Sequence, residues 1–281
     1  MAGMEIWLFD VDQGAAAFVR APNGASMMID CGRKDSLSPV LWVRENLLSD
    51  VDRASTHPLT KLVVTHPHDD HIEDIENLTQ QLRPRIISRN LYDWLEVENE
   101  SGGDYENLRQ WAKFQATYMS PVGPVDWGGM EVSDFGLSVE EAKELNEAKF
   151  INNSSIVTVL GLGGFKVVLP GDVERDGWLE LLRREDVRTA VSGTDVFITS
   201  HHGHPSGYAA ELYEIMGCPF FNVSSIHGRD TSIEKAYSSE KCAKGVQWEG
   251  EKRYHFTTRA DGTFHLTVSP EGGGKFEFLT L

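Results

Sequence analysis

The sequence predicts an α/β fold of four layers, in which two β-sheets pack face to face and helices cover both outer surfaces. Two observations favour this architecture. Strand-like and helix-like segments come in two similar sets, separated by a looser stretch at residues 90–150. In each set, apolar strands end in loops that carry histidine or aspartate. Sheets packed in this way would bring those loops together at one edge, so that side chains far apart in the chain could meet.

The first set opens with three strands and a helix. Residues 4–10 alternate in polarity and are rich in aromatic side chains, which predicts a strand. Two further strands are predicted at residues 15–21 and 26–30, because the Pro-Asn-Gly sequence between them is a strong hairpin turn. Apolar residues at helical spacing follow a serine suited to an N-cap and predict a helix over residues 39–48.

The rest of the first set surrounds a histidine-rich loop. Residues 61–64 form a short apolar, β-branched run, which predicts a buried strand. Pro67 bars further ladder pairing, so the histidines after this run lie in a loop at the end of the strand. A helix is predicted from about residue 70 to residue 82, and a short strand follows at residues 85–88.

Residues 90–150 show a looser pattern, with helices predicted only at residues 104–118 and 138–149. Because this stretch lies between the two halves of the candidate site, we interpret it as a lid or substrate-selecting insertion. It belongs to a single predicted domain that spans residues 1–281. An insertion without a functional role is the alternative.

The second set of elements restarts with strands. Strands are predicted at residues 155–160, 165–169, 195–199 and 219–224, and helices at residues 174–184, 208–216 and 233–242. The glycine-rich residues 161–164 lack the lysine and hydroxyl residue of a phosphate loop, so they predict a hairpin turn. Residues 254–258 and 263–268 are predicted to form a hairpin across the Asp-Gly sequence at residues 261–262.

The composition indicates an acidic globular protein. The 281 residues are 40% hydrophobic, which is enough for a sizeable core. The formal net charge is −17, from 26 basic and 43 acidic residues. Such a surface repels nucleic acid at long range and disfavours anionic membranes, although divalent ions would dominate the field in their own site. We therefore expect no membrane partner, and a small or single-stranded substrate is favoured over long duplex DNA.

The three cysteines, Cys31, Cys218 and Cys242, are odd in number and show no CxxC spacing. This pattern indicates free thiols in a reducing compartment. Residues 1–10 have neither the basic nor the long apolar region of a signal peptide, and no run approaches the length needed to cross a bilayer. We therefore expect a cytoplasmic protein.

Four potential metal ligands lie within six residues: His66, His68, Asp70 and His71. In extended backbone, residues two apart point the same way, so His66 and His68 can reach one ion. The predicted helix turns Asp70 and His71 toward a second ion. Imidazole with carboxylate suits zinc, and also manganese or iron. A chance cluster on a solvated loop is the alternative, but this spacing after a buried strand disfavours it.

Two further ligand-type positions follow predicted strands of the second set. Asp172 comes after the strand at residues 165–169 and could bridge both ions, and a histidine of the pair His201 and His202 would complete the second ion. Two metals about 3.5–4 Å apart can bind and polarise a bridging hydroxide, which is the layout of two-metal hydrolases. The sequence thus predicts a hydrolase that uses two divalent metal ions, Zn or Mn.

These motifs, in this order, resemble those of the metallo-β-lactamase superfamily, and within it the soluble relatives of the hydrolase domain in ComEC-type competence proteins. Residues 66–71 fit HxHxDH in full, residues 169–173 resemble the LTGD motif, and residues 201–203 resemble HHG. Weaker likenesses are to the DVGQG opening at residues 9–14, the IDTG segment at 28–32, the NNSS-type strand start at 152–157 and the T-x-x-D-G hairpin at 257–262. Asp12 replaces a glycine of the opening, and Glu73-Asp74 replaces a Gly-Gly pair of the branch.

The resemblance implies a four-layer αββα metallo-β-lactamase sandwich and a metal role for each matched residue. His66 and His68 would bind the first metal and Asp70 and His71 the second, with Asp172 between them. His201 is the expected last ligand, and His202 is the alternative or a substrate contact.

The usual third histidine of the first metal has no counterpart, since no histidine occurs between His71 and His201. Asn153 or Asn152 stands where the branch has its asparagines, and a neutral oxygen donor there would hold the first metal more weakly. Asp10 and Asp30 are expected to orient ligand histidines or to hold the metal loop, with turn capping as the alternative.

The resemblance favours a phosphodiesterase or nuclease-type hydrolase, whose partner is a phosphodiester substrate such as a nucleic acid or a nucleotide. Asp70, His201, His202 and His227 are the candidate catalytic residues, and one of the three histidines would protonate the leaving oxygen. Two alternatives stay open. The same site could act on a lactone, β-lactam or thioester, or the chain could be a metal-poor binding subunit, which the missing third histidine motivates.

Overall fold

The computed structural model describes residues 2–101, 106–120, 122–225 and 235–281. The first sheet contains β1 (Met4–Leu8), β2 (Ala17–Arg20), β3 (Ser26–Ile29), β4 (Leu59–Val63), β5 (Pro84–Ser88), β14 (Thr263–Val268) and β15 (Gly274–Leu279). The second contains β6 (Glu131–Phe135), β7 (Val157–Leu162), β8 (Phe165–Leu169), β9 (Val196–Ile198), β10 (Phe221–Ser224) and β13 (His255–Thr257). A separate hairpin pairs β11 (Val246–Trp248) with β12 (Glu251–Arg253).

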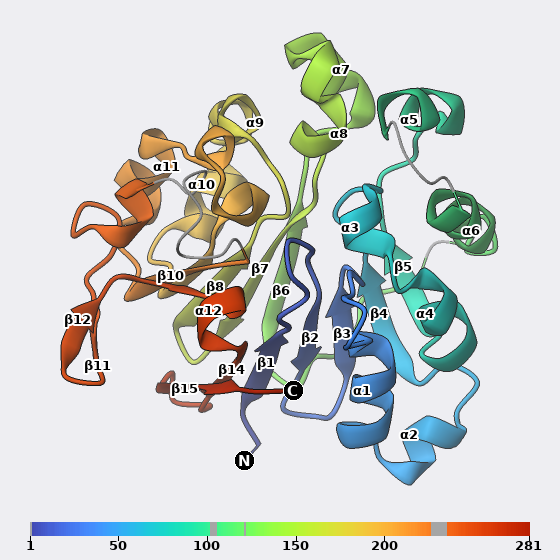
Figure 1. Cartoon of the computed structure of the whole chain (residues 1–281), viewed down its shortest axis with the longest axis horizontal. Coiled ribbons are helices and arrows are strands. Elements are labelled where there is room, and N and C mark those ends of the chain that lie inside the picture. The colour runs from blue at the N-terminus through green and yellow to red at the C-terminus, as the bar shows by residue number, and fades with distance from the viewer. Residues whose placement is uncertain (1, 102–105, 121, 226–234) are drawn as a thin grey trace.

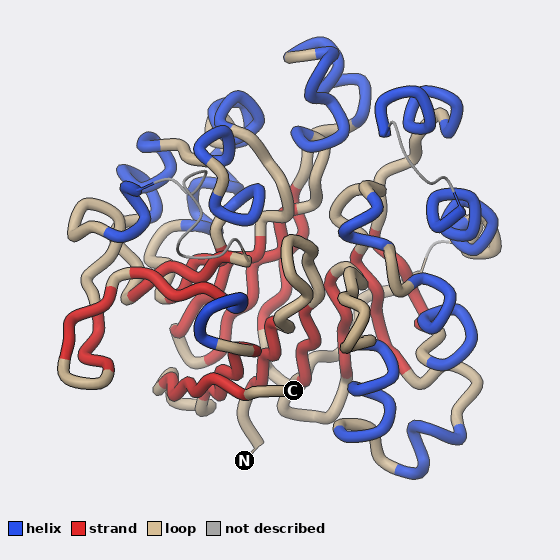
Figure 2. The backbone as a smooth tube through the Cα atoms, in the orientation of Figure 1, coloured by secondary structure: helices blue, strands red, loops and turns tan. Residues whose placement is uncertain are grey.

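The strand order is β15-β14-β1-β2-β3-β4-β5 in the first sheet and β13-β10-β9-β8-β7-β6 in the second. The helices on the side of the first sheet are α1 (Pro39–Asn46), α2 (Asp50–Ala54), α3 (Asp69–Ile72), α4 (Ile75–Gln81), α5 (Trp94–Ser101) and α6 (Glu106–Gln115). Those on the side of the second are α7 (Val139–Leu145), α8 (Phe150–Asn153), α9 (Arg175–Leu181), α10 (Glu185–Val191) and α11 (Ala210–Met216). The two sheets lie between these helix groups, which confirms the predicted four-layer fold (Figures 1 and 2).

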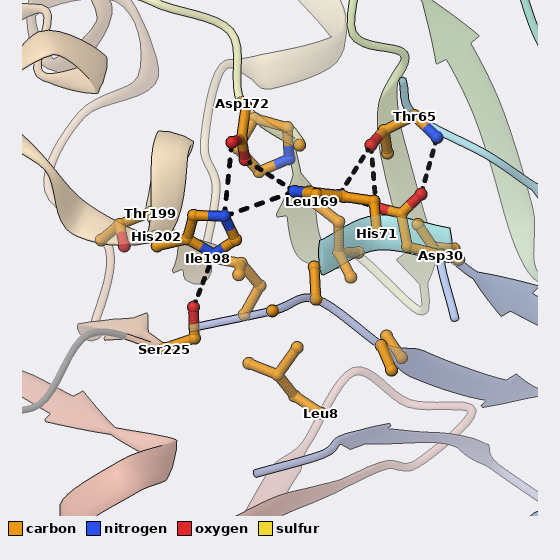
Figure 3. Close-up of a pocket in the computed structure, with 17 residues that line it drawn as sticks. Leu8, Asp30, Thr65, His71, Leu169, Asp172, Ile198, Thr199, His202 and Ser225 are labelled. Carbon is orange, nitrogen blue, oxygen red and sulfur yellow. Dashed lines mark hydrogen bonds and ion pairs between the residues drawn. The ribbon is translucent and has the colours of Figure 1, made fainter. Parts of the chain in front are cut away.

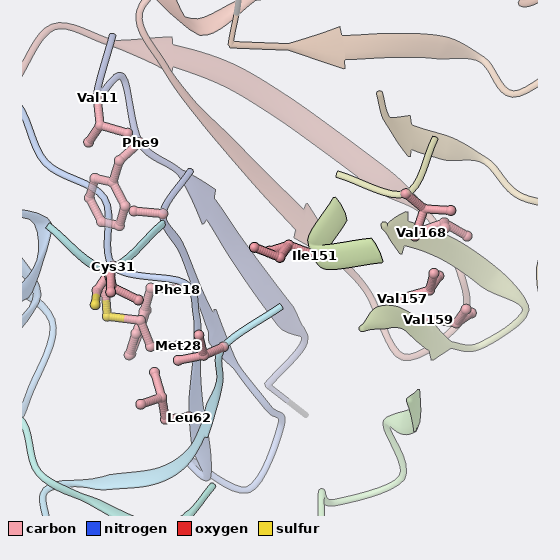
Figure 4. Packing of buried hydrophobic residues seen from close by; sticks show 14 of the residues in the cluster. Phe9, Val11, Phe18, Met28, Cys31, Leu62, Ile151, Val157, Val159 and Val168 are labelled. Carbon is pink, nitrogen blue, oxygen red and sulfur yellow. The ribbon is translucent and has the colours of Figure 1, made fainter. Parts of the chain in front are cut away.

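Alternation along the strands divides the apolar side chains between the layers. In β1, Met4 and Ile6 belong to the core between the sheets, whereas Trp7 belongs to the core beneath the helices. Figure 4 shows part of the core beneath the helices. Phe18, Met28 and Leu62 come from the first sheet, and Val157, Val159 and Val168 come from the second sheet. The period-two pattern read from residues 4–10 therefore corresponds to the division of these side chains between the two cores.

Parallel pairing brings the loops with ligand-type residues to one edge of the sandwich. β4 runs parallel to β3, and β9 runs parallel to both β8 and β10. The loop at residues 66–71 follows β4, Asp172 follows β8, and the His201–His202 pair follows β9. The predicted convergence of these loops is confirmed by the contacts among their side chains.

The predicted hairpin over residues 254–268 is wrong. β13 pairs with β10 in the second sheet, whereas β14 pairs with β1 in the first. The short helix α12 (Thr258–Asp261) carries the chain from one sheet to the other. The Asp-Gly signal marked the reversal correctly, but a local turn signal does not say which strand each segment will pair with.

The stretch at residues 90–150 contributes to both halves of the fold. α5 and α6 lie on the side of the first sheet, and α6 contacts α3 and α4. β6 instead pairs with β7 and forms the edge of the second sheet. Sequence reasoning missed this strand because its residues EVSDF form no apolar run and none of them is fully buried.

Other differences are local. The helix predicted at residues 174–184 ends at Leu181, and α10 follows as a separate helix. Of the helix predicted at residues 233–242, the described part holds only a 3₁₀ turn at Lys235–Ser238. The hairpin β11–β12 and the strand β15 were not predicted. The three cysteines are free thiols, as predicted. None of the described helices is long and apolar enough to cross a membrane.

His255 provides a test of this core by pH. The ring is buried in β13, where Nε2 lies 3.0 Å from Ser224 Oγ, and burial lowers the pKa of His255 to about 4. Because an unfolded histidine has a pKa near 6.5, the unfolded state binds more protons between these values. The contribution of His255 to the free energy of unfolding should therefore fall by about 3 kcal/mol as the pH drops from about 6.5 to about 4.

The measurement is urea unfolding across this pH range for the wild type and for His255→Gln. The variant lacks the titrating ring, so its stability should depend less steeply on pH. An NMR titration that gives His255 a pKa near 6.5 would contradict the prediction.

Candidate metal centre

The loop at residues 66–71 is held in place by the segments that precede β2 and follow β3. The amide of Ala15 donates to the carbonyl of Asp70 at 3.1 Å, and the amide of Cys31 donates to the carbonyl of His71 at 2.8 Å. Gly32 is required for this close approach, because a Cβ there would lie 2.3 Å from the Asp70 carbonyl oxygen. The backbone of the loop is therefore held by main-chain hydrogen bonds to other segments of the first half of the chain.

Asp30 orients a histidine of the loop, as predicted. Its Oδ2 lies 2.7 Å from His71 Nδ1, and its two oxygens accept hydrogen bonds from the amide and hydroxyl of Thr65 (Figure 3). This leaves His71 Nε2 free to face the site. Asp10 does not orient a histidine, because its carboxylate pairs with Lys34 at 2.5 Å.

His66 and His68 point ring nitrogens at one place. His66 Nε2 lies 3.0 Å from His68 Nδ1. The other nitrogen of His66, Nδ1, lies 3.2 Å from the hydroxyls of both Thr65 and Ser155. Hydroxyl partners on Nδ1 orient the ring and leave Nε2 as the donor to an ion, which is how ligand histidines are held.

Asp172 lies at the centre of the cluster. Its Oδ1 is 3.3 Å from His71 Nε2, and its Oδ2 is 3.3 Å from His202 Nε2 and 3.8 Å from His66 Nε2. The amide of Asp172 donates to Ser155 Oγ at 3.1 Å. The carboxylate therefore reaches residues from both halves of the chain, as expected of a bridging group.

His202 lies closer than His201 to the other ligand-type side chains, whereas the ligand chosen from the sequence was His201. His202 Nε2 lies 3.1 Å from Asp70 Oδ2 and 3.3 Å from His71 Nε2. Its Nδ1 lies 2.7 Å from Ser225 Oγ, a contact that orients the ring (Figure 3). The sequence could not show which of the two adjacent histidines lies among the ligand-type side chains. Both residues have a positive φ, 50° and 59°, and this backbone turns their rings to different places.

His201 lies beside the cluster and is more exposed. Its Nε2 is 3.8 Å from Asp172 Oδ2, while its Nδ1 is 2.8 Å from Ser206 Oγ and 3.6 Å from Glu174 Oε1. The side chain is 26% exposed, against 10% for His202. This position suits a group that meets substrate better than one enclosed among ligands.

The side chain of Asn153, which was predicted to supply an oxygen to the first metal, is engaged by two backbone amides. Its Oδ1 accepts hydrogen bonds from the amides of Glu174 at 3.1 Å and Gly177 at 3.2 Å. Asn153 thus satisfies amides at the start of α9, and both lone pairs of the oxygen are used. Asn152 donates to Glu174 Oε1 at 3.3 Å.

The charges of the cluster are strongly coupled. Burial alone would lower the pKa of His71, but Asp172, Asp30 and Asp70 raise it well above its usual value. For His202, Asp172 and Asp70 likewise outweigh burial and raise the pKa to about 9. Burial would raise the pKa of Asp172, but His202 and His71 hold it well below its usual value.

His66 and His68 behave differently, because burial lowers the pKa of both rings. Neutral imidazoles offer a lone pair to a metal at neutral pH. A divalent cation would also take the place of the protons that the carboxylates hold on the other two histidines.

The residues present fit divalent ions. Ligand atoms form two groups, and within each group they lie within 4.8 Å of one another: His66, His71 and Asp172 form one, and Asp70, His71 and His202 form the other. Each of His66, His71 and His202 has its second nitrogen against a hydroxyl or carboxylate, so the set has the orienting partners of a metal site. Behind it, a cavity of about 40 Å³ is lined largely by apolar residues such as Leu8 and Ile198 (Figure 3).

The candidate His227 lies outside the described residues. Sequence reasoning missed the hydroxyls that orient the histidines, namely Thr65, Ser155 and Ser225. Ser155 could have been predicted from the sequence, because it belongs to the NNSS-type segment at residues 152–157. Ser225 carries no signal of its own, since it meets His202 only through the fold.

Comparison with known proteins indicates the family to which this chain belongs. A family model described as the metallo-beta-lactamase superfamily matches residues 9–214. A curated relative, ComE operon protein 3 of Bacillus subtilis (strain 168), is 24% identical over 222 residues. The match covers 75% of this chain but only 27% of that protein, so the chain spans about a quarter of its relative's length.

Two of the solved structures to which this chain is similar have low sequence identity. A metallo hydrolase named Igni18, from the archaeon Ignicoccus hospitalis, is 13% identical with a TM-score of 0.45, and the match covers 89% of this chain and 97% of that one. The short form of human tRNase Z is 15% identical with a TM-score of 0.44, with 80% and 93% covered.

Proposed function

Because this chain belongs to the metallo-β-lactamase superfamily of metal-dependent hydrolases, we propose that it hydrolyses phosphodiester bonds with the help of two divalent ions, zinc or manganese. The observation that carries the proposal is the position of Asp172, whose carboxylate reaches ligand residues of both groups. The likeness to the ComEC-type branch, represented by ComE operon protein 3, favours phosphodiesters over lactams and thioesters.

Each residue has a part in this proposal. His66, His68 and Asp172 would hold one ion, and Asp70, His71, His202 and Asp172 the other. Ions bound there supply an activated water and offset negative charge on a phosphodiester. The protein's own residues orient these ligands and shield the back of the site with apolar side chains.

His201 is the proposed proton donor to the leaving oxygen. It is more exposed than His202, and its Nδ1 is held by Ser206 at 2.8 Å, which leaves Nε2 directed toward the Asp172 side of the site. General acid catalysis needs a group that is within reach of the substrate and oriented by a second contact. His202 is enclosed by carboxylates and does not meet this need.

We also propose that α5 and α6 border the substrate and select it. Asn107 of α6 donates to Asp69 Oδ1 at 2.8 Å, so this helix is tied to the metal loop. Before α5, Tyr92 shares a hydrogen bond of 2.9 Å with Ser154, next to Ser155 of the site. The net charge of −17 favours a small or single-stranded substrate over long duplex DNA.

The test combines metal content with a substrate panel. Protein purified without added metal, and again after zinc or manganese loading, is analysed for metal per chain. The loaded protein is then assayed on bis(p-nitrophenyl) phosphate, single-stranded oligonucleotides and cyclic nucleotides, with a lactone, a β-lactam and a thioester as comparison. We expect about two ions per chain and turnover of phosphodiesters that a chelator abolishes.

Other results would change the assignment in defined ways. Turnover of the lactone, β-lactam or thioester but not of the phosphodiesters would mean that the substrate is a carbonyl compound and not a phosphodiester. One ion per chain would require a mechanism for a single metal. No bound metal after loading would contradict the enzyme proposal and favour the metal-poor binding subunit.

A further inference from the structure

We propose that two copies of this chain associate through β15 and join their first sheets into one continuous sheet. β15 is an end strand of the first sheet. All six of its residues pair with β14 on one side, and no strand of the described chain pairs with the other side. An open strand edge of this length presents unpaired amides and carbonyls, which another strand can satisfy.

The charges of β15 complement a second copy of the same strand. Lys275 and Glu277 are both exposed and lie on the same face of the strand. In an antiparallel pair with its two-fold axis at Phe276, Lys275 lies opposite the partner's Glu277. The two-fold symmetry repeats this contact, so two opposite-charge pairs form at once. Opposite charges directly across a strand pair are stabilising, and like charges are destabilising.

Other registers of the same pairing are disfavoured. With the axis at Lys275 or at Glu277, each of these residues would face its own copy, so like charges would meet. A slip by one residue would turn the apolar face of the second copy to the opposite side of the sheet. Only the register with the axis at Phe276 satisfies both the charges and the faces.

The apolar face of β15 is also incomplete at this edge. Phe276 and Phe278 belong to the layer between the sheets, where both contact the ring of Trp248, yet both stay partly exposed. A hollow of about 530 Å³ lies beside the start of the strand, lined by Gly274 and Phe276 and by Phe220, which is 39% exposed.

The proposed register places the partner's Phe278 opposite Gly274, beside this hollow. The pairing would therefore add apolar burial to the backbone hydrogen bonds. A charged edge by itself guards against pairing. Here the order of the two charges is self-complementary and an apolar hollow adjoins them, and these two features favour a second copy of this chain over an unrelated strand.

The experiment is sedimentation velocity from about 1 to about 100 µM, a range that covers micromolar association. The wild type should show a monomer–dimer equilibrium. Glu277→Lys and Lys275→Glu should each weaken the dimer about tenfold, because two attractive pairs become repulsive. The double variant Lys275→Glu/Glu277→Lys restores opposite charges across the pair, so it should recover the wild-type dimer.

The controls isolate the contact between copies. Glu271→Lys makes the same charge change in the turn before β15, so it should leave the dimer unchanged. Glu277 also contacts His265 of its own chain at 3.0 Å, and Glu277→Lys and the double variant both lose this contact, whereas Lys275→Glu keeps it. Circular dichroism checks that each variant is folded. A wild type that stays monomeric at about 100 µM, or a dimer that tolerates either single exchange, would overturn the proposal.

Discussion

Replacing Asp172 by asparagine is expected to lower kcat/KM of the metal-loaded protein by about 10³-fold or more and to reduce the bound metal. Asparagine keeps the size of the side chain and the amide that donates to Ser155. It removes the negative charge that lies 3.3 Å from both His71 Nε2 and His202 Nε2. Because bound ions contribute several kcal/mol to hydrolysis, and about 1.4 kcal/mol corresponds to a factor of ten, the loss should reach about three decades.

The measurement is metal per chain together with steady-state kinetics on the best phosphodiester of the panel. Asp186→Asn provides a matched control, because Asp186 is an exposed aspartate that pairs with Arg184. This control should keep both its metal and its activity. An Asp172→Asn protein that is folded, retains two ions per chain and remains active would contradict the bridging role proposed for this residue.

Exchange of His202 and exchange of His201 are expected to have different effects, although the two residues are adjacent. His202→Asn should lose bound metal and lower activity by about 10²–10³-fold, because this ring lies among Asp70, His71 and Asp172. His201→Asn should keep its metal but lower kcat by about 10²–10⁴-fold on substrates with a poor leaving group. The p-nitrophenyl esters need little proton donation, so they should be much less affected.

The two variants control for each other. Both positions have a positive φ, and asparagine tolerates this backbone better than most residues, so the strain of the exchange is similar in both proteins. Metal content separates a ligand from a proton donor without reference to activity. Loss of metal in His201→Asn but not in His202→Asn would reverse the assignment and restore the choice made from the sequence.

The metal loop was readable from the sequence because its signal is local. Residues 66–71 place four ligand-type side chains at a short spacing after a buried strand, and the structure puts His66, His68, Asp70 and His71 around one centre. The strand that precedes Asp172 was recognised in the same way. What such patterns predict is the end of a strand and the residues that follow it.

Two predictions depended on contacts between segments that lie far apart in the sequence. The oxygen of Asn153, which was predicted to reach the first metal, accepts hydrogen bonds from amides at the start of α9, and the sequence does not show which loop meets which helix. The hairpin predicted near the end of the chain was wrong for a similar reason. Its two strands bury their faces in different sheets, β13 beside β10 and β14 beside β1.

The sequence by itself determined the four-layer class, the loop at residues 66–71 and the approach of Asp172 and the histidine pair to it. These features follow from strand periodicity and from ligand spacing within a few residues. Only the tertiary structure decided that His202 joins the cluster while His201 lies beside it, and that Ser155 and Ser225 orient the rings. The physical reason is that these contacts join residues between 23 and 131 positions apart, so they exist only after neighbouring strands have paired and the two sheets have packed.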